Sequence, residues 1–170
     1  VSSSYETKES VETKFQNLQI GGQNLIRDTG FTYSPTLWSG ISTNNWNIDT
    51  VNKFGNVNTA KISRSNLTAD SWSELRSEAY PVKQGEKYVG SFYIKYSNVD
   101  MGSIFAIWGY DANGGNRQTL YAETFSGTNN EWTRLHKAVV IPAGVTQIRV
   151  CLSSRRNGTI WGGKAQLEKG

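Results

Sequence analysis

The side chains in this sequence best suited to chemistry are aromatic residues that alternate along a short apolar segment, residues 104–110. Trp108 and Tyr110 are two positions apart, and residues of equal parity project from the same face of a β-strand. A flat aromatic ring can cover the apolar C–H side of a sugar, while polar groups at its rim bind the hydroxyls. The spacing therefore predicts a platform of the kind that binds saccharides.

Polar groups that can form such a rim follow directly, in the glycine-rich loop 111–117. Arg149 has the opposite parity to its apolar neighbours, so it faces outward if those neighbours face the core. Its planar guanidinium suits an anionic sugar substituent or a phosphate. Further ring surface lies on or beside other expected strands. The candidate ligand-binding residues are Trp72, Trp108, Tyr110, Asp111, Asn113, Arg117, Tyr121 and Arg149.

These residues also have structural interpretations. Trp108 can equally fill the core against the segment 88–96, because tryptophan is mostly buried in folded proteins. An arginine at the position of Arg149 more often faces solvent or pairs with a neighbouring acid. Replacement of Trp108 by Ala separates the two interpretations of that ring, since only loss of a core residue would collapse the fold.

Catalysis has the least support in the sequence. His136 is the single histidine and lies inside an expected strand, away from any serine or cysteine motif. Glycoside hydrolysis requires two carboxylates at a fixed separation, and no spacing singles out such a pair. The sequence also lacks a metal cluster, a phosphate loop and a dinucleotide fingerprint. We therefore expect a binding protein rather than an enzyme.

The elements that position these residues are strands. The segment 86–96 is the longest aromatic and β-branched run, and Tyr88, Phe92 and Ile94 are expected to face the core, which leaves Tyr93 and Lys95 on the other face. Strands are expected near residues 24–27, 46–51, 59–63, 73–77, 88–96, 104–110, 119–123, 132–141, 146–152 and 159–167. Ten short strands separated by turn signals predict an all-β fold, an antiparallel two-sheet β-sandwich or jelly roll.

The first residues differ from the rest. Within 1–20, apolar and polar side chains recur at alternating steps of three and four, which is typical of a helical seam. This segment is expected to be either the end of an oligomeric coiled coil or a linker. Paired glycines at Gly21 and Gly22 then end the helix. We expect two parts, a leader at 1–20 and a β-sandwich domain at 21–170.

Charge and composition limit the classes of partner and of location that we expect. The net charge is +4, but lysine and arginine are scattered, so we expect no nucleic acid partner. No run of 18 apolar residues exists, so no membrane insertion is expected, and the first 20 residues lack a signal-peptide pattern. Cys151 is the single cysteine, which excludes an intrachain disulfide and predicts a small buried residue.

Several motifs resemble a known family. The start Gly21-Gly-Gln-Asn-Leu-Ile26, the following Asp28-Thr-Gly-Phe31 and the closing Gly163-Lys-Ala-Gln-Leu-Glu-Lys-Gly170 are similar to jelly-roll carbohydrate-binding modules. The variant with this start and finish resembles modules in tail, baseplate and fibre proteins of phages that infect Gram-positive bacteria. The resemblance assigns Trp38, Trp132 and Trp161 to packing.

The resemblance implies a function and a setting. It implies adhesion to a cell-wall polysaccharide or other glycan, an extracellular location in the phage virion, contact with other tail or baseplate proteins, and a homotrimer. Two alternatives stay open: a structural or protein-docking domain of the same particle, and an accessory binding module of a secreted polysaccharide hydrolase.

The resemblance also raises the question of a metal. Many family members hold a structural calcium ion near the sheet edge, often through an acid in the last strand. Here Trp161-Gly-Gly-Lys164 occupies that stretch, and Asp28 alone does not supply the six or more oxygens that the ion needs. We expect no required cofactor, and calcium stays an open question.

Overall fold

The computed structural model describes residues 23–32 and 37–170 of the chain. The described residues form β-strands and connecting segments, and none of them is helical. The strands are β1 (Asn47–Phe54), β2 (Val57–Arg64), β3 (Ser73–Arg76), β4 (Tyr80–Pro81), β5 (Lys87–Tyr110), β6 (Gln118–Val140), β7 (Gln147–Ser154) and β8 (Gly158–Lys169). All strand pairs are antiparallel, so the expected all-β antiparallel class is confirmed.

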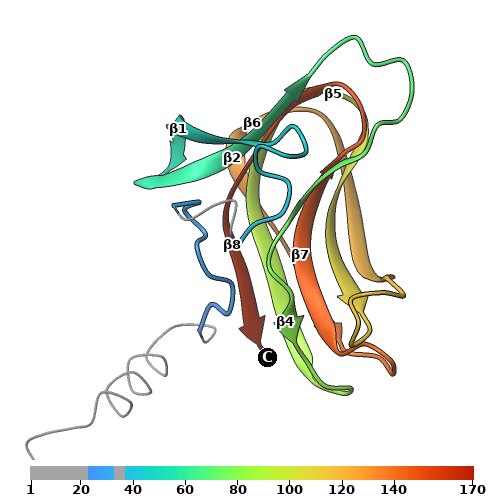
Figure 1. The fold of residues 1–170 in the computed structure, drawn as a ribbon. Coiled ribbons are helices and arrows are strands. Elements are labelled where there is room, and N and C mark those ends of the chain that lie inside the picture. Colours follow the sequence, from blue (N-terminus) through green and yellow to red (C-terminus); the bar gives the residue numbers. More distant parts are fainter. Residues whose placement is uncertain (1–22, 33–36) are drawn as a thin grey trace, which may run out of the picture.

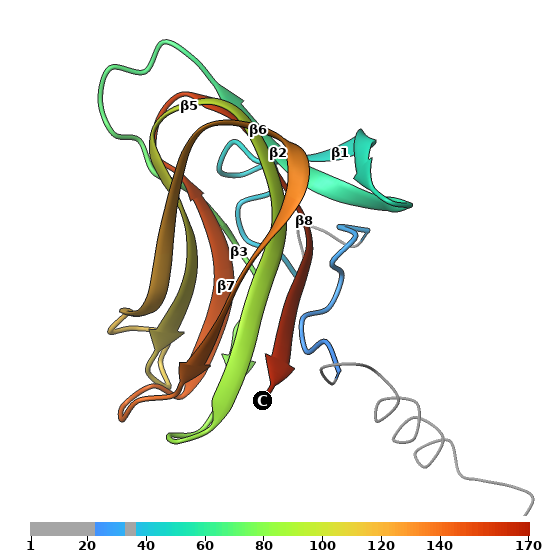
Figure 2. The same cartoon turned by 180° about the vertical axis from the view of Figure 1, so that it is seen from behind.

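Two long strands link the two halves of the fold. β5 and β6 pair with each other along most of their length and curve together from one half to the other (Figures 1 and 2). The first half of β5 also pairs with β8, and its second half pairs with β7. The strand order is β1-β2-β8-β5-β7-β3, with β4 on β7 and β6 on β5. One curled sheet thereby supplies both walls of the sandwich.

The core lies between these walls. Tyr88, Phe92 and Ile94 are buried in it, as their parity predicted. The second half of β5 adds Phe105 and Ile107 from the opposite wall. This apolar cluster is the main stabilising element of the described fold, because burial of apolar surface is the dominant favourable contribution to folding.

The expected strand boundaries need three corrections. The segments 88–96 and 104–110 are parts of one 24-residue strand, and 119–123 and 132–141 are parts of one 23-residue strand. Ser97 and Asn98, a polar pair that was expected to end the strand 88–96, lie where the register shifts instead of at a chain reversal, and Asn98 has a φ of 53°. Residues 24–27 form no strand, although the Leu25 amide donates to the Leu167 carbonyl at 2.7 Å. The expected helix at 1–20 lies outside the described residues.

The tryptophans also divide differently from the expectation. Trp38 is 1% exposed and belongs to the core, as predicted. Trp46 is fully buried and donates from Nε1 to the Ser73 carbonyl at 3.1 Å. Trp132 and Trp161 are a correction, because both are half-buried outside the core. In the described part of the chain, no helix has the length and apolar character needed to cross a membrane.

Candidate functional site

Trp108 and Tyr110 lie on the sheet face that points away from the core. They form a small separate cluster with Ala106 and Cys151, beside the main core and not part of it. The register pairs Trp108 with Arg149 and Ala106 with Cys151, and directly paired residues share a face. Arg149 therefore faces the same side as Trp108, as its parity predicted. The burial of Cys151 is also confirmed.

A hollow of about 310 Å³ opens on this face. Its lining comes from four strands and two flanking segments: Trp72, Glu74, Ile104, Trp108, Arg117, Thr119, Ala122 and Ser153. We call this surface the arginine–tryptophan face. Ser153 lines the hollow, and its hydroxyl is buried without a hydrogen-bond partner in the described structure. An unpaired buried hydroxyl is costly, so a polar ligand that reached this atom would gain a hydrogen bond that the protein itself does not supply.

The two tryptophans of the hollow differ in exposure. Trp108 is only 5% exposed, because the Arg117 guanidinium lies over its ring at 4.0 Å from the centroid. Trp72 is 44% exposed, and Arg155 lies 5.6 Å from its ring centroid. Trp72 is thus the open aromatic surface, while Trp108 forms the floor of the hollow beneath Arg117.

The arginines at this hollow are paired with carboxylates. Arg117 pairs with Glu74, with Nη1 2.9 Å from Oε2 and 3.2 Å from Oε1. Arg155 and Arg156 both contact Asp70, at 3.0 and 2.7 Å. Hydrogen bonds from Arg155, and also from Arg156, hold the pKa of the Asp70 carboxyl below its ordinary value. The hollow therefore combines aromatic surface with a polar rim in which each arginine already has a carboxylate partner.

Asp111 has a different role from a rim ligand. Its Oδ1 accepts the amides of Asn113 and Gly115, both at 2.9 Å, and Oδ2 accepts Asn116 Nδ2. The hydrogen bond from the Gly115 amide is the largest cause that holds the pKa of the Asp111 carboxyl below its usual range, and the bonds from Asn113 and Asn116 add to it. Asp111 thus organises the loop that ends at Arg117, and Asn113 is exposed on it.

Tyr121 lies on the other side of the sheet from Trp108. It pairs with Ile107, packs against the main core, and its ring centroid is 6.1 Å from that of Phe105. Its hydroxyl donates to Glu123 Oε1 at 2.7 Å. The structure brings Trp72, Trp108 and Arg117 together in one hollow and leaves Tyr121 outside it.

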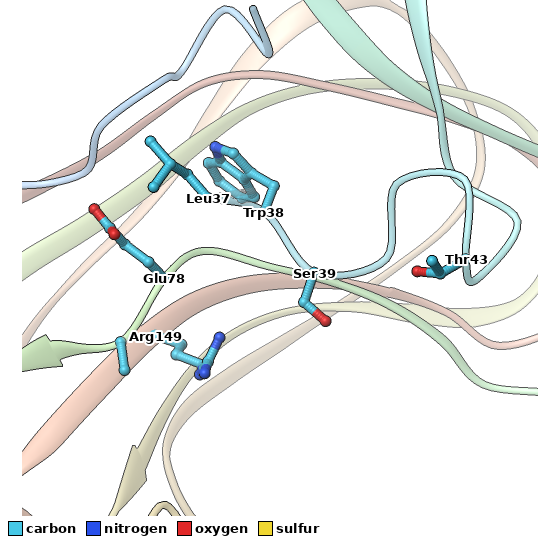
Figure 3. A pocket seen from close by; sticks show the side chains of 7 residues that line it. Leu37, Trp38, Ser39, Thr43, Glu78 and Arg149 are labelled. Atoms are coloured by element: carbon cyan, nitrogen blue, oxygen red, sulfur yellow. The ribbon is translucent and has the colours of Figure 1, made fainter. Parts of the chain in front are cut away.

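Tyr110 and Arg149 lie further along the same face. The Arg149 guanidinium is 5.8 Å from the Tyr110 ring centroid, and its Nη1 donates to the Ser77 carbonyl at 2.7 Å. Arg149 also lines a second hollow of about 420 Å³. Figure 3 shows Arg149, Glu78 and Ser39 around this second hollow. Glu78 is paired with Arg27 through two hydrogen bonds of 2.8 Å.

Sequence reasoning did not select Glu74 or Ser153 as ligand contacts. Both lie where a strand alternates between core and surface: Glu74 follows buried Ser73, and Ser153 is paired with Ile104. The alternation within each strand was readable, but the pairing that brings β3, β7 and β5 together was not.

Asp28 is the residue that the resemblance offered as a metal ligand. The Asp28 carboxylate accepts the Thr32 amide at 2.6 Å, and its main-chain carbonyl accepts Trp38 Nε1 at 3.0 Å. Within residues 23–32 and 37–170, no group of three or more His, Cys, Asp or Glu side chains could hold a metal ion. A hard cation needs more oxygen ligands than Asp28 can offer.

Comparisons with known proteins place the fold. The sequence matches no protein-family model and no curated protein. Among solved structures, the CBM22-1 xylan-binding domain of Paenibacillus barcinonensis Xyn10C superposes with a TM-score of 0.58 at 12% identity, covering 79% of this chain and 86% of that one. TmCBM61 in complex with β-1,4-galactotriose gives 0.57 at 19% identity, covering 88% and 100%. The chain has the jelly-roll fold of carbohydrate-binding modules.

A phage protein shares the fold as well. The enzymatically active domain of bacteriophage CBA120 tailspike protein 4 gives a TM-score of 0.55 at 12% identity, and the match covers 74% of this chain but 19% of that one. At these identities the likeness concerns the fold alone.

Proposed function

We propose that this domain binds glycans without transforming them, and that the arginine–tryptophan face is its binding site. The observation that carries the proposal is the hollow between Trp72 and Trp108, whose lining includes Ser153, a residue with a buried hydroxyl that has no hydrogen-bond partner in the described structure. Aromatic surface for C–H groups and a free hydroxyl for hydrogen bonding are the two features that sugar recognition requires. Two structural neighbours, a xylan-binding domain and a module in complex with a galactotriose, support the same class of ligand.

The charge balance of this face favours a neutral saccharide. Arg117 and Arg155 are already paired with Glu74 and Asp70. An anionic ligand would have to replace one of these carboxylates, whereas neutral hydroxyls can accept from the guanidinium groups while the pairs remain. We therefore propose a hydroxyl-rich, uncharged glycan as the ligand of the arginine–tryptophan face.

The proposed setting is a tail or baseplate protein of a phage that infects Gram-positive bacteria. The motifs at both ends of the domain and the fold of a phage tailspike domain support this setting. A single shallow face binds weakly, so the proposed homotrimer would increase the avidity for a repetitive cell-wall polysaccharide. Other tail or baseplate proteins would then be its structural partners.

A glycan array tests the binding proposal. We expect the fluorescently labelled domain to bind a small set of neutral glycans, and Trp72→Ala to lose that binding. Val51→Ala is the matched control, because Val51 is 85% exposed and lies on β1, at the opposite end of the strand order from β3, which follows Trp72. Both variants should melt like the wild type. Absence of glycan binding by the folded wild-type chain would overturn the proposal.

A second candidate function is an accessory module of a secreted polysaccharide hydrolase. It is favoured by a neighbour of the same fold that is joined to a GH10 module, at a TM-score of 0.54 and 11% identity. A phage tail protein and a hydrolase module would both bind glycan through the same face, so the array does not distinguish these two candidates. Labelling of Gram-positive cells and the sequence that flanks this domain in its gene do separate them.

A further inference from the structure

We propose that a second face of the domain, on the sheet half that includes β2, β8, β5 and β6, binds a saccharide chain bearing carboxylate or phosphate groups. This inference is independent of the proposed function of the arginine–tryptophan face. It starts from four side chains on four adjacent strands, which we call the lysine–tryptophan row: Lys61 on β2, Trp161 on β8, Lys95 on β5 and Trp132 on β6. Lys61 and Lys95 are each paired directly with Trp161 in the register.

The lysine and tryptophan side chains of this row are in contact. The Lys61 and Lys95 ammonium groups lie 5.3 and 5.0 Å from the Trp161 ring centroid. Lys95 also lies 5.2 Å from the centroid of Trp132. These distances are within the range of cation–π attraction. The row is therefore an ordered, half-buried surface rather than a set of independent side chains.

Neighbouring aromatic residues support the row from one side. The Phe54 ring lies 4.3 Å from that of Tyr93 and 5.5 Å, edge to face, from that of Trp132. Gly163 permits this arrangement, because a Cβ there would stand 3.3 Å from Phe54 Cβ and 3.1 Å from Thr59 Cγ2. The aromatic surface thus extends beyond the two tryptophans.

The carboxylate that contacts the row among the described residues is that of Asp49, and both of its oxygens already accept hydrogen bonds. Trp161 Nε1 donates to Asp49 Oδ2 at 3.0 Å, and the Val51 and Asn52 amides donate to Oδ1 at 2.8 Å. Burial raises the pKa of the Asp49 carboxyl, but the hydrogen bonds from Asn52, Val51 and Trp161 outweigh this and leave it far below its ordinary value. The ionised Asp49 carboxylate therefore fixes the orientation of the Trp161 ring.

The two ammonium groups have no carboxylate partner among the described residues. Ion pairs at up to 4.0 Å are found for Arg27, Arg117, Arg155, Arg156 and Lys169. Lys61 and Lys95 instead lie over tryptophan rings. Their charge is thus free to attract an anion, in contrast to the paired arginines of the first face.

The spacing suits an extended chain that crosses the strands. Lys61 and Lys95 flank β8, so their strands are about 10 Å apart, twice the usual separation of adjacent strands. A chain laid along the row meets an ammonium group, a ring, an ammonium group and a ring in turn. Sugar C–H groups can contact the part of the half-buried tryptophan rings that the lysines leave exposed, while carboxylate or phosphate groups pair with the lysines.

The arrangement favours a saccharide over single-stranded nucleic acid. Base stacking needs an open ring face along a positively charged groove. Trp161 has an ammonium group near its ring from each of the two neighbouring strands, so its ring face is not open. Sugar substituents can meet the lysines at the surface without inserting a flat base between them.

Affinity electrophoresis in gels that contain polygalacturonate tests the proposal. We expect the wild-type domain to be retarded, and the double variant Lys61→Gln/Lys95→Gln to bind about tenfold more weakly, the effect expected for two exposed ion pairs. A gel with phosphorylated dextran in place of polygalacturonate distinguishes phosphate from carboxylate as the preferred anion. Added salt should weaken the wild-type interaction more than that of the double variant.

The matched control is Lys83→Gln/Lys137→Gln, which removes the same charge from two exposed lysines outside the row. Equal losses in the two double variants would overturn the proposal, because they would indicate a general charge effect. Tighter binding of single-stranded DNA with the same lysine dependence would overturn the saccharide assignment.

The two faces can fail separately. Trp72→Ala should retain polygalacturonate binding, and Lys61→Gln/Lys95→Gln should retain binding of a neutral glycan. If the folded wild type binds neither anionic polymer, the second face is refuted and the first is unaffected. If polyanion binding depends on the row while no neutral glycan binds, the first proposal fails and the second stands.

Discussion

Replacement of Trp108 by Ala should lower the stability of the domain as well as its glycan binding. The ring is 5% exposed and packs in a small cluster with Ala106, Tyr110 and Cys151, under the guanidinium of Arg117. Truncation of a buried tryptophan costs roughly 3–5 kcal/mol in transfer and cavity energy. For a domain of this size, a loss of 3 kcal/mol lowers the melting temperature by roughly 6–12 °C.

Trp72→Ala provides the comparison for this prediction. Trp72 is 44% exposed and belongs to neither buried cluster, so its removal should change the stability by about 1 kcal/mol or less. Its effect on glycan binding should be larger, about 2 kcal/mol or roughly thirtyfold in Kd, as for an aromatic hot spot. The two tryptophans therefore differ in the ratio of binding loss to stability loss.

Differential scanning calorimetry and isothermal titration calorimetry on the two variants measure these quantities. The neutral glycan with the strongest array signal serves as ligand. A Trp108→Ala variant that melts like the wild type but no longer binds would refute the reasoning, because it would show that Trp108 is an open platform. A Trp72→Ala variant with unchanged affinity would refute the site itself.

Two further predictions concern single groups. The folded-state pKa of Asp49 is lowered, so its stabilising contribution is complete above the unfolded value near 3.9 and is lost as the pH falls below it; acid unfolding of Asp49→Asn should depend less on pH below about 4 than that of the wild type. Cys151 is fully buried and desolvation raises its thiol pKa, so a thiol reagent should label it only as fast as the domain unfolds. Rapid labelling under native conditions would contradict its placement beneath the first face.

The long strand β5 shows what alternation in the sequence can and cannot predict. Its two halves were identified as strands, and the core positions of Tyr88, Phe92 and Ile94 followed from parity. The residues between the halves carry a turn signal because asparagine tolerates a positive φ, which Asn98 adopts at 53°. The same conformation also fits a bulge, and pairing with neighbouring strands decides between turn and bulge.

A second limit is visible at Tyr121. Parity within the segment 119–123 does not determine whether Tyr121 lies on the same sheet face as Trp108, because that depends on the cross-strand register. The register between β5 and β6 shifts between Ile107 and Trp108, so that Tyr121 pairs with Ile107 and Thr119 with Trp108. A shift of one residue moves a side chain to the opposite face. Tyr121 therefore packs toward the core, while Trp108 faces the hollow.

The sequence resemblance misplaced Trp132 and Trp161 for a related reason. Lys95, which parity had already assigned to the outer face of β5, is paired directly with Trp161 and lies 5.2 Å from the ring centroid of Trp132. Only the pairing of β8 and β6 with β5 shows that the tryptophans share this face. Their aromatic character favoured packing, and Lys95 between them was the signal that a surface was involved.

The pairing of charges distinguishes the two faces more sharply than their aromatic content does. Both present tryptophan rings beside cationic groups, but Arg117 of the first face has a carboxylate partner whereas Lys95 of the second has none among the described residues. A guanidinium already held in an ion pair can still donate to neutral hydroxyls, since it has five donors. An ammonium group over an aromatic ring keeps its full charge for an anion. The same fold can therefore present one face to uncharged sugar and the other to an anionic chain.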